Sequence, residues 1–261
     1  MNRKKDHIKI LAIIQARMGS SRLPGKVLKD ICGSPMLEWV TVRAQMASNV
    51  GQVVVATTEK DEDDPIEEFC INRGIACFRG AEFDVLDRFY RAAENYDADI
   101  IVRLTADCPL VDPGLIDDVI EKLLESGADF VANRLPPPFR RTYPIGLDVE
   151  AARFEALKTA WEKAEKPYER EHVLPYIYDP GNSFQVEVLD AGKDLGSLRW
   201  TVDTELDLAF VRGVTRELNC SFNFSWEDVL DVLDSHPDLE KINLNVPHKS
   251  LNDVDQRLED R

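Results

Sequence analysis

Residues Ile13 to Lys26 read IIQARMGSSRLPGK, and this stretch decides how the rest of the chain is interpreted. The apolar, β-branched run that leads into it, at 8–14, is typical of a buried first strand. A helix is predicted to begin near Pro35, because proline is favoured in a first helical turn. Small residues between the strand and the helix allow backbone N–H groups to approach phosphate oxygens. Three cations in the same stretch would neutralise the phosphate charge: Arg17, Arg22 and Lys26.

Another interpretation of this stretch is an ordinary strand-to-helix connection whose basic side chains are only solvated. Its residue order excludes two common phosphate loops, because both G-x-x-x-x-G-K-[ST] and the three-glycine dinucleotide fingerprint are absent from it. In either case the cations are expected to be exposed. Replacing Arg17 or Lys26 should therefore leave the melting temperature almost unchanged.

Strands and helices alternate over the first half of the chain, which predicts an α/β fold with a mainly parallel, Rossmann-like central sheet and helices on both faces. Ligands bind such sheets at the carboxyl ends of the strands. The loops at 15–26, 56–64, 79–84 and 105–109 are therefore expected to converge. After the first strand, the predicted strands are 53–57, 75–78, 99–104 and 129–132, and the predicted helices are 65–73, 84–96 and 113–126.

The alternation breaks after residue 132. An irregular insertion near 133–150 follows, and long irregular loops in compact domains are usually functional. Beyond it we expect helices at 151–163, 170–178, 204–218 and 225–233, and strands at 184–189 and 198–202. Residues 1–247 are expected to form one domain, followed by a charged tail at 248–261.

Composition excludes several classes of protein. The net charge of −16 argues against a nucleic-acid partner, which needs a basic face. No apolar run is long enough for a membrane span, so no membrane association is expected. The five cysteines form no C-x-x-C pair, which indicates reduced thiols and a cytoplasmic protein, with neither a disulfide framework nor a zinc site.

Two aspartates that follow predicted strands, Asp107 and Asp203, are candidate ligands for a divalent cation. A triphosphate needs such a cation to offset its charge, and Mg²⁺ prefers carboxylate and water oxygens. Each aspartate also has a structural interpretation, because Asp107 could form only a turn and Asp203 could cap the next helix. As metal ligands the two carboxylates would repel each other. Neutralising either is then expected to leave the metal-free protein at least as stable.

The opening stretch resembles the A-R-x-x-S-x-R-L-P-x-K signature of the sugar cytidylyltransferases, and the spore-coat polysaccharide SpsF group is the most similar in wording. Asp107 matches the family's D-x-P-L turn and Asp203 its D-T-x-x-D turn, in which the aspartates bind the metal. The resemblance spans about residues 8–207. It implies a GT-A-type nucleotidyltransferase domain with Arg17 and Lys26 as catalytic cations. Asp107 and Asp203 would hold Mg²⁺, with Asp207 as a further candidate ligand.

The same resemblance assigns nucleotide contacts to Ala16, Arg17, Gly19, Ser20, Arg22, Lys26, Ala56, Thr57, Thr58, Arg79 and Asp107. It assigns contacts with the acceptor sugar to Arg140, Arg141, Asp148 and His172. Structural alternatives are a surface ion pair for Arg79, an acidic partner for Arg103 and helix packing for His172. Two departures from the sialic-acid and octulosonate enzymes, Gln15 in place of proline and no glycine before Asp107, move the chain away from those substrates.

The activity implied by the resemblance is nucleotidyl transfer for surface polysaccharide or glycan biosynthesis. A sugar hydroxyl attacks the α-phosphorus of CTP, and pyrophosphate leaves. One alternative is a GT-A-type glycosyltransferase that uses a nucleotide sugar, although its D-x-D motif is absent from 104–108. Another is a non-catalytic nucleotide-binding partner protein. The expected partners are CTP and a sugar acceptor, and a homodimer is expected by analogy of fold.

Overall fold

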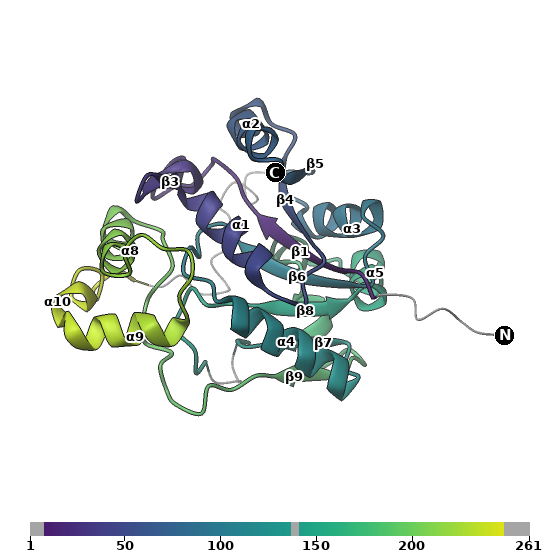
Figure 1. Ribbon diagram of the computed structural model, residues 1–261. Coiled ribbons are helices and arrows are strands. Elements are labelled where there is room, and N and C mark those ends of the chain that lie inside the picture. Colours follow the sequence, from purple (N-terminus) through teal and green to yellow (C-terminus); the bar gives the residue numbers. More distant parts are fainter. Residues whose placement is uncertain (1–7, 137–140, 248–261) are drawn as a thin grey trace.

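Seven strands form the central sheet in the described part of the chain, residues 8–136 and 141–247 (Figure 1). The structure is a computed structural model. The strand order is β5-β4-β1-β6-β8-β7-β9, and β8 alone is antiparallel to its neighbours. The predicted, mainly parallel α/β sheet is therefore confirmed. The strands are β1 (Ile10–Gln15), β4 (Gln52–Thr58), β5 (Ala76–Gly80), β6 (Ile100–Thr105), β7 (Phe130–Ala132), β8 (Glu150–Arg153) and β9 (Val186–Val188).

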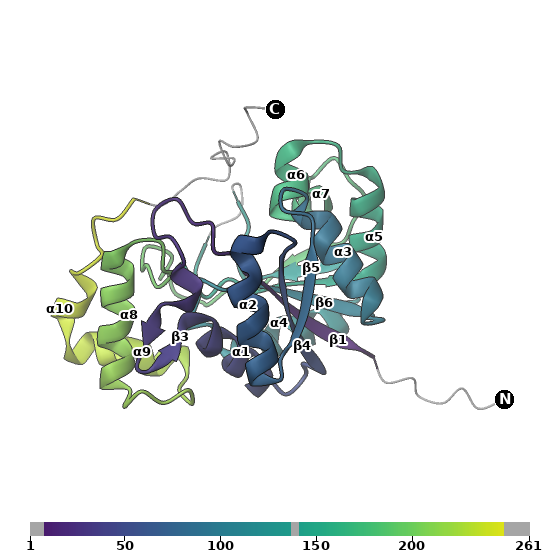
Figure 2. The ribbon, with the colours of Figure 1, turned by 90° about the horizontal axis from the view of Figure 1, so that it is seen from above.

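Helices cover both faces of this sheet, as predicted (Figures 1 and 2). Ala12 and Ile14 of β1 pack into one hydrophobic core and Leu11 and Ile13 into the other. Since β1 is buried on both sides, its sequence is a continuous apolar run. One face carries α1 (Met36–Met46), α2 (Asp64–Arg73) and α4 (Pro113–Ser126), and the other α3 (Val85–Asn95), α5 (Phe154–Lys163), α6 (Pro167–His172) and α7 (Pro175–Tyr178). Among the described residues, no helix combines the length and hydrophobicity needed to cross a bilayer.

The last helices lie together at one end of the molecule, beside α1 (Figures 1 and 2). Arg43 of α1 links this end to the segment between β6 and α4, because its buried guanidinium donates to the carbonyl oxygens of Val111 (2.6 Å), Phe222 (2.5 Å) and Phe224 (3.0 Å). Burial lowers the pKa of Arg43 to about 10, so it stays charged at neutral pH. The elements of this end are β2 (Asp30–Ile31), β3 (Ser34–Pro35), α8 (Glu205–Glu217), α9 (Trp226–Ser235) and α10 (Pro237–Glu240).

Three predictions for the second half of the chain were wrong in detail. The predicted helix at 151–163 begins only at Phe154, because the preceding residues form β8 between β6 and β7. The predicted strand at 198–202 makes only an isolated bridge between Ile145 and Arg199. The predicted helix at 170–178 is two short helices, with Val173 at φ 75° between them. In the first case, pairing with β6 and β7 overrides the local helical pattern.

The prediction that all five cysteines are reduced thiols is wrong for two of them. Cys32, in the turn between β2 and β3, forms a disulfide with Cys220, which follows α8, and their Cα atoms are 5.7 Å apart. The two residues are 188 positions apart in the sequence, so only the packing of α8 against β2 brings them together. The cysteine content therefore no longer supports the argument for a reducing compartment.

Gly146 allows the insertion to pack directly onto residues 200–201. Its φ is +106°, and a Cβ there would lie 2.5 Å from the Thr201 nitrogen and 2.7 Å from the Trp200 carbonyl carbon. We expect Gly146→Ala to lower the free energy of unfolding by about 3 kcal/mol, measured by urea denaturation. Gly192→Ala is the control, because Gly192 has φ +71° but open space, and it should lose only about 1 kcal/mol. Equal losses would show that space at Gly146 is not limiting.

Candidate active site

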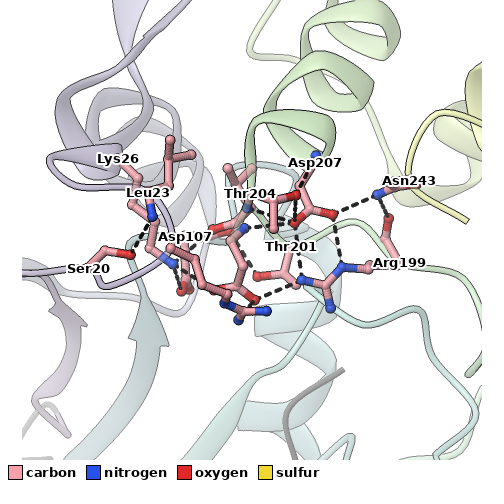
Figure 3. Close-up of polar contacts among 12 residues, drawn as sticks. Ser20, Leu23, Lys26, Asp107, Arg199, Thr201, Thr204, Asp207 and Asn243 are labelled. Carbon is pink, nitrogen blue, oxygen red and sulfur yellow. Dashed lines mark hydrogen bonds and ion pairs between the residues drawn. The ribbon is translucent and has the colours of Figure 1, made fainter. Parts of the chain in front are cut away.

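Lys26 lies at the centre of a charged cluster at the carboxyl end of the sheet (Figure 3). It begins the short helix η1 (Lys26–Leu28), after the loop that leaves β1. Its Nζ lies 2.7 Å from Oδ2 of Asp107, which follows β6, and 2.9 Å from Oδ1 of Asp203, which precedes α8. It also donates to the carbonyl oxygen of Val202 at 2.8 Å. The structure therefore brings the predicted cation and both predicted metal ligands into direct contact.

Lys26 and Asp203 each stabilise the charged form of the other. Burial alone would lower the pKa of Lys26, but Asp107 and Asp203 outweigh it and raise that pKa above its usual value. Burial would likewise raise the pKa of Asp203, but the cations around it, Lys26 first, lower that pKa well below its usual range. The expectation that Lys26 is exposed was wrong, because the residue is only 8% exposed.

Two arginines hold the other oxygen of Asp203. Arg22 from the β1 loop and Arg199 each approach Oδ2 of Asp203 at 2.8 Å. The N-cap of α8 is Thr204, whose side chain accepts from the backbone N–H of Asp207. Asp203 is therefore not the capping residue, and the structural alternative that we considered for it is wrong.

Asp207 lies beside Thr204 and Arg199 in the cluster and supports it (Figure 3). It is completely buried, and its carboxylate accepts from Arg199 Nε at 2.9 Å and from Asn243 Nδ2 at 3.0 Å. It also accepts from the backbone N–H groups of Asp203 (3.0 Å) and Thr204 (2.9 Å). Asp207 therefore orients the turn that carries Asp203. The sequence did not point to Asn243, because it lies 36 positions from Asp207. It did not point to Arg199 either, although that residue is only four positions from Asp203, because the run around it was predicted to be a strand.

A further missed residue, Asp63, fixes the loop after β1. It is completely buried in the short helix η2 (Asp61–Asp63) and accepts from the backbone N–H of Met18 at 2.6 Å. Its other oxygen accepts from the hydroxyl of Thr58. Asp63 therefore ties the loop that contains Arg17 to the end of β4. Its only signal in the sequence was an acidic run that is equally typical of a solvated loop.

Arg17, the other predicted catalytic cation, lies near the buried Arg88. Burial and the charge of Arg17 together lower the pKa of Arg88 to about 10. The loop continues through Gly19 and Ser20, and the Ser20 hydroxyl accepts from the backbone N–H of Leu23 at 3.4 Å. These small residues thus lie in a turn that brings Arg22 and Lys26 to the carboxylates.

The residues predicted to contact the nucleoside lie at the ends of adjacent strands. Ala16 donates its backbone N–H to Ala56 at 3.1 Å, and the side chains of Ala56, Thr57 and Thr58 are buried in β4. Arg79 of β5 donates to Asp64 at 2.7 Å and to Glu67 at 2.8 Å, so its ion-pair interpretation is confirmed. Its contact with a nucleotide stays a prediction.

The residues predicted to contact the acceptor sugar are more dispersed. Arg141 donates to Asp148 at 3.1 Å within the insertion, His172 is half-buried at the end of α6, and Arg140 lies outside the described residues. Arg103 pairs with Glu150, as its alternative predicted. Burial and the charges of Asp107 and Asp148 together raise the pKa of Cys108 well above its usual value, so the charge of Asp148 acts on the residue next to Asp107.

The cluster is suited to holding charge rather than to covalent catalysis. The one thiol beside it, Cys108, is kept protonated and is therefore a poor nucleophile. The ammonium of Lys26 marks a point at which carboxylates from two segments converge on one cation. In the described residues no three or more His, Cys, Asp or Glu side chains are grouped to hold a metal. Two carboxylates completed by water and phosphate oxygens fit the usual binding of Mg²⁺.

Comparisons with known proteins show the family of this chain. The family model described as cytidylyltransferase matches residues 11–213. An uncharacterised protein of Methanocaldococcus jannaschii is 39% identical over 251 residues, covering 95% of this chain and all of the relative. The spore coat polysaccharide biosynthesis protein SpsF of Bacillus subtilis is 32% identical over 237 residues, covering 88% of this chain and 95% of the relative.

A solved structure extends the agreement to the whole fold. A cytidylyltransferase from Leptospira borgpetersenii superposes with a TM-score of 0.84 and is 33% identical, covering 94% of this chain and all of the other. The family match includes all of β1 but Ile10, the loop after β1, and both Asp107 and Asp203, the two carboxylates that the structure pairs with Lys26. The chain therefore belongs to the cytidylyltransferase family.

Proposed function

We propose that this protein is a magnesium-dependent cytidylyltransferase that transfers CMP from CTP to a sugar hydroxyl and releases pyrophosphate. The observation that carries the proposal is the bridge that Lys26 makes between Asp107 and Asp203. A phosphate-binding cation and two carboxylates that can hold a metal meet at the edge where parallel sheets bind ligands. The similarity to SpsF supports a role in the biosynthesis of a surface polysaccharide or another glycan.

The role of each residue in the proposed reaction follows from its charge. Nucleotidyl transfer depends mostly on positioning and on neutralising charge. Arg17, Arg22 and Lys26 would bind the phosphates and stabilise the leaving pyrophosphate. Asp107 and Asp203 would hold Mg²⁺, which when bound would neutralise phosphate charge and acidify the attacking hydroxyl.

The reaction is tested by pyrophosphate release. Each of the four nucleoside triphosphates is incubated with Mg²⁺ and a library of acidic and amino sugars. We expect release with CTP and one class of sugar only. Consumption of a nucleotide sugar without pyrophosphate would instead support the glycosyltransferase, and no turnover of any substrate would support the non-catalytic partner protein.

Nucleotide choice has a separate prediction that needs no acceptor. A ligand present at about 100 times its Kd stabilises the folded protein by about 2.7 kcal/mol. With Mg²⁺, CTP should therefore raise the melting temperature by about 5 °C, and ATP, GTP and UTP at the same concentration should raise it less. Scanning fluorimetry measures the shift. Equal shifts from all four nucleotides would contradict the choice of cytosine and leave nucleotidyl transfer in place.

A further inference from the structure

The ammonium of Lys26 uses its full hydrogen-bonding capacity within the protein. A lysine ammonium has three N–H donors. Its three acceptors here are Asp107 Oδ2 at 2.7 Å, Asp203 Oδ1 at 2.9 Å and the Val202 carbonyl oxygen at 2.8 Å. In this arrangement Lys26 has no donor left for a phosphate oxygen. The role proposed for it at the triphosphate therefore requires it to give up at least one of these partners.

Asp203 is engaged through both of its carboxylate oxygens, and Asp107 through Oδ2. Oδ2 of Asp203 accepts from Arg22 and from Arg199, so Oδ1, the oxygen that faces Lys26, is the one that a new cation could share with Asp107. Two cations on the same pair of oxygens repel each other strongly where burial lowers the effective dielectric constant. A divalent ion that binds these two oxygens therefore competes with Lys26.

We propose that Lys26 is an internal counter-ion: in the nucleotide-free protein it occupies the point where Asp107 and Asp203 converge, and it leaves when a triphosphate offers it other acceptors. The inference rests on the proposed function for the identity of the incoming ligands. It predicts that a divalent ion alone binds weakly, because the open carboxylate pair is a minor state. It also predicts that triphosphate and metal each strengthen binding of the other, since such coupling is reciprocal.

The test measures Mn²⁺ binding to the full chain without nucleotide, using the electron paramagnetic resonance signal of unbound Mn²⁺. Lys26→Met removes the competing charge and should bind Mn²⁺ at least about tenfold more tightly than the parent protein. Lys29→Met is the matched control, because Lys29 lies in the same region but pairs at 3.1 Å with the exposed Glu205. It should bind Mn²⁺ with the parental affinity.

A second variant keeps the test valid if Lys26→Met folds poorly, and a further substitution shows whether the gained Mn²⁺ affinity arises at Asp107. Lys26→Gln also removes the charge but keeps a polar side chain, and it should show the same gain. Adding Asp107→Asn to either variant should abolish that gain. Mn²⁺ should also raise the melting temperature of Lys26→Met more than that of the parent, since only the variant has an open carboxylate pair.

Parental or weaker Mn²⁺ affinity in both Lys26 variants would overturn the inference, and so would a gain that survives Asp107→Asn. Failure of the proposed function has a different signature. If the parent protein releases no pyrophosphate with any nucleotide and sugar, the proposed function is contradicted. The Mn²⁺ measurement uses neither substrate, so it still decides whether Lys26 competes with a metal.

Discussion

Replacing Lys26 by alanine is expected to lower turnover by about 100- to 1000-fold, the loss typical of removing one group that stabilises developing negative charge. In the proposed reaction that charge forms on the leaving pyrophosphate. Unlike a solvated cation, Lys26 also contributes to stability, because it bridges Asp107 and Asp203 at 2.7 Å and 2.9 Å. Since both carboxylates retain some exposure to water, we expect a loss of about 2 kcal/mol, less than for a fully buried pair.

Pyrophosphate release measures the first effect and urea denaturation the second. Lys29→Ala is the control, because its ion pair with Glu205 is exposed and should contribute little to stability. It should keep parental turnover. A Lys26→Ala enzyme with near-parental turnover on every nucleotide would show that this loop is not the phosphate site, whatever its stability.

Asp203→Asn is expected to reduce turnover by at least about 100-fold, because the neutral amide is a weaker ligand for a hard divalent cation. The substitution does not remove a helix cap, since Thr204 rather than Asp203 caps α8. Activity should recover in part at high Mg²⁺ or Mn²⁺, and Asp107→Asn should behave in the same way. Glu205→Gln in the first turn of α8 is the control and should keep parental turnover.

The effect on stability reverses the expectation drawn from the sequence. If the two carboxylates only repelled each other, neutralising one would not lower the stability of the protein. Asp203 is instead contacted by three cations, Lys26, Arg22 and Arg199. These cations lower its pKa against the opposing effect of burial. Asp203→Asn should therefore destabilise the metal-free protein, measured by urea denaturation. A variant of parental stability and parental turnover at limiting Mg²⁺ would remove Asp203 from the metal site.

By itself, the sequence determined the first half of the fold and the place of the site. The continuous apolar runs specified strands that are buried on both faces. Proline and glycine signals specified most of the helices between them, and the 3.6-residue periodicity specified the helix at 84–96. Since parallel strands present their carboxyl ends at one edge, the sequence predicted that the loops carrying Lys26 and Asp107 would converge. The family resemblance added the metal-binding roles.

Only the tertiary structure decided which charges contact each other. Lys26 and Asp203 are 177 residues apart, Cys32 and Cys220 are 188 apart, and Asn243 reaches Asp207 from a segment beyond the family match. The same holds for β8, whose alanines favour a helix but pair with β6 and β7. Local patterns report local backbone preference and burial. Which distant residues contact each other depends on how the sheet and the helices pack together. No short stretch of the sequence contains that information.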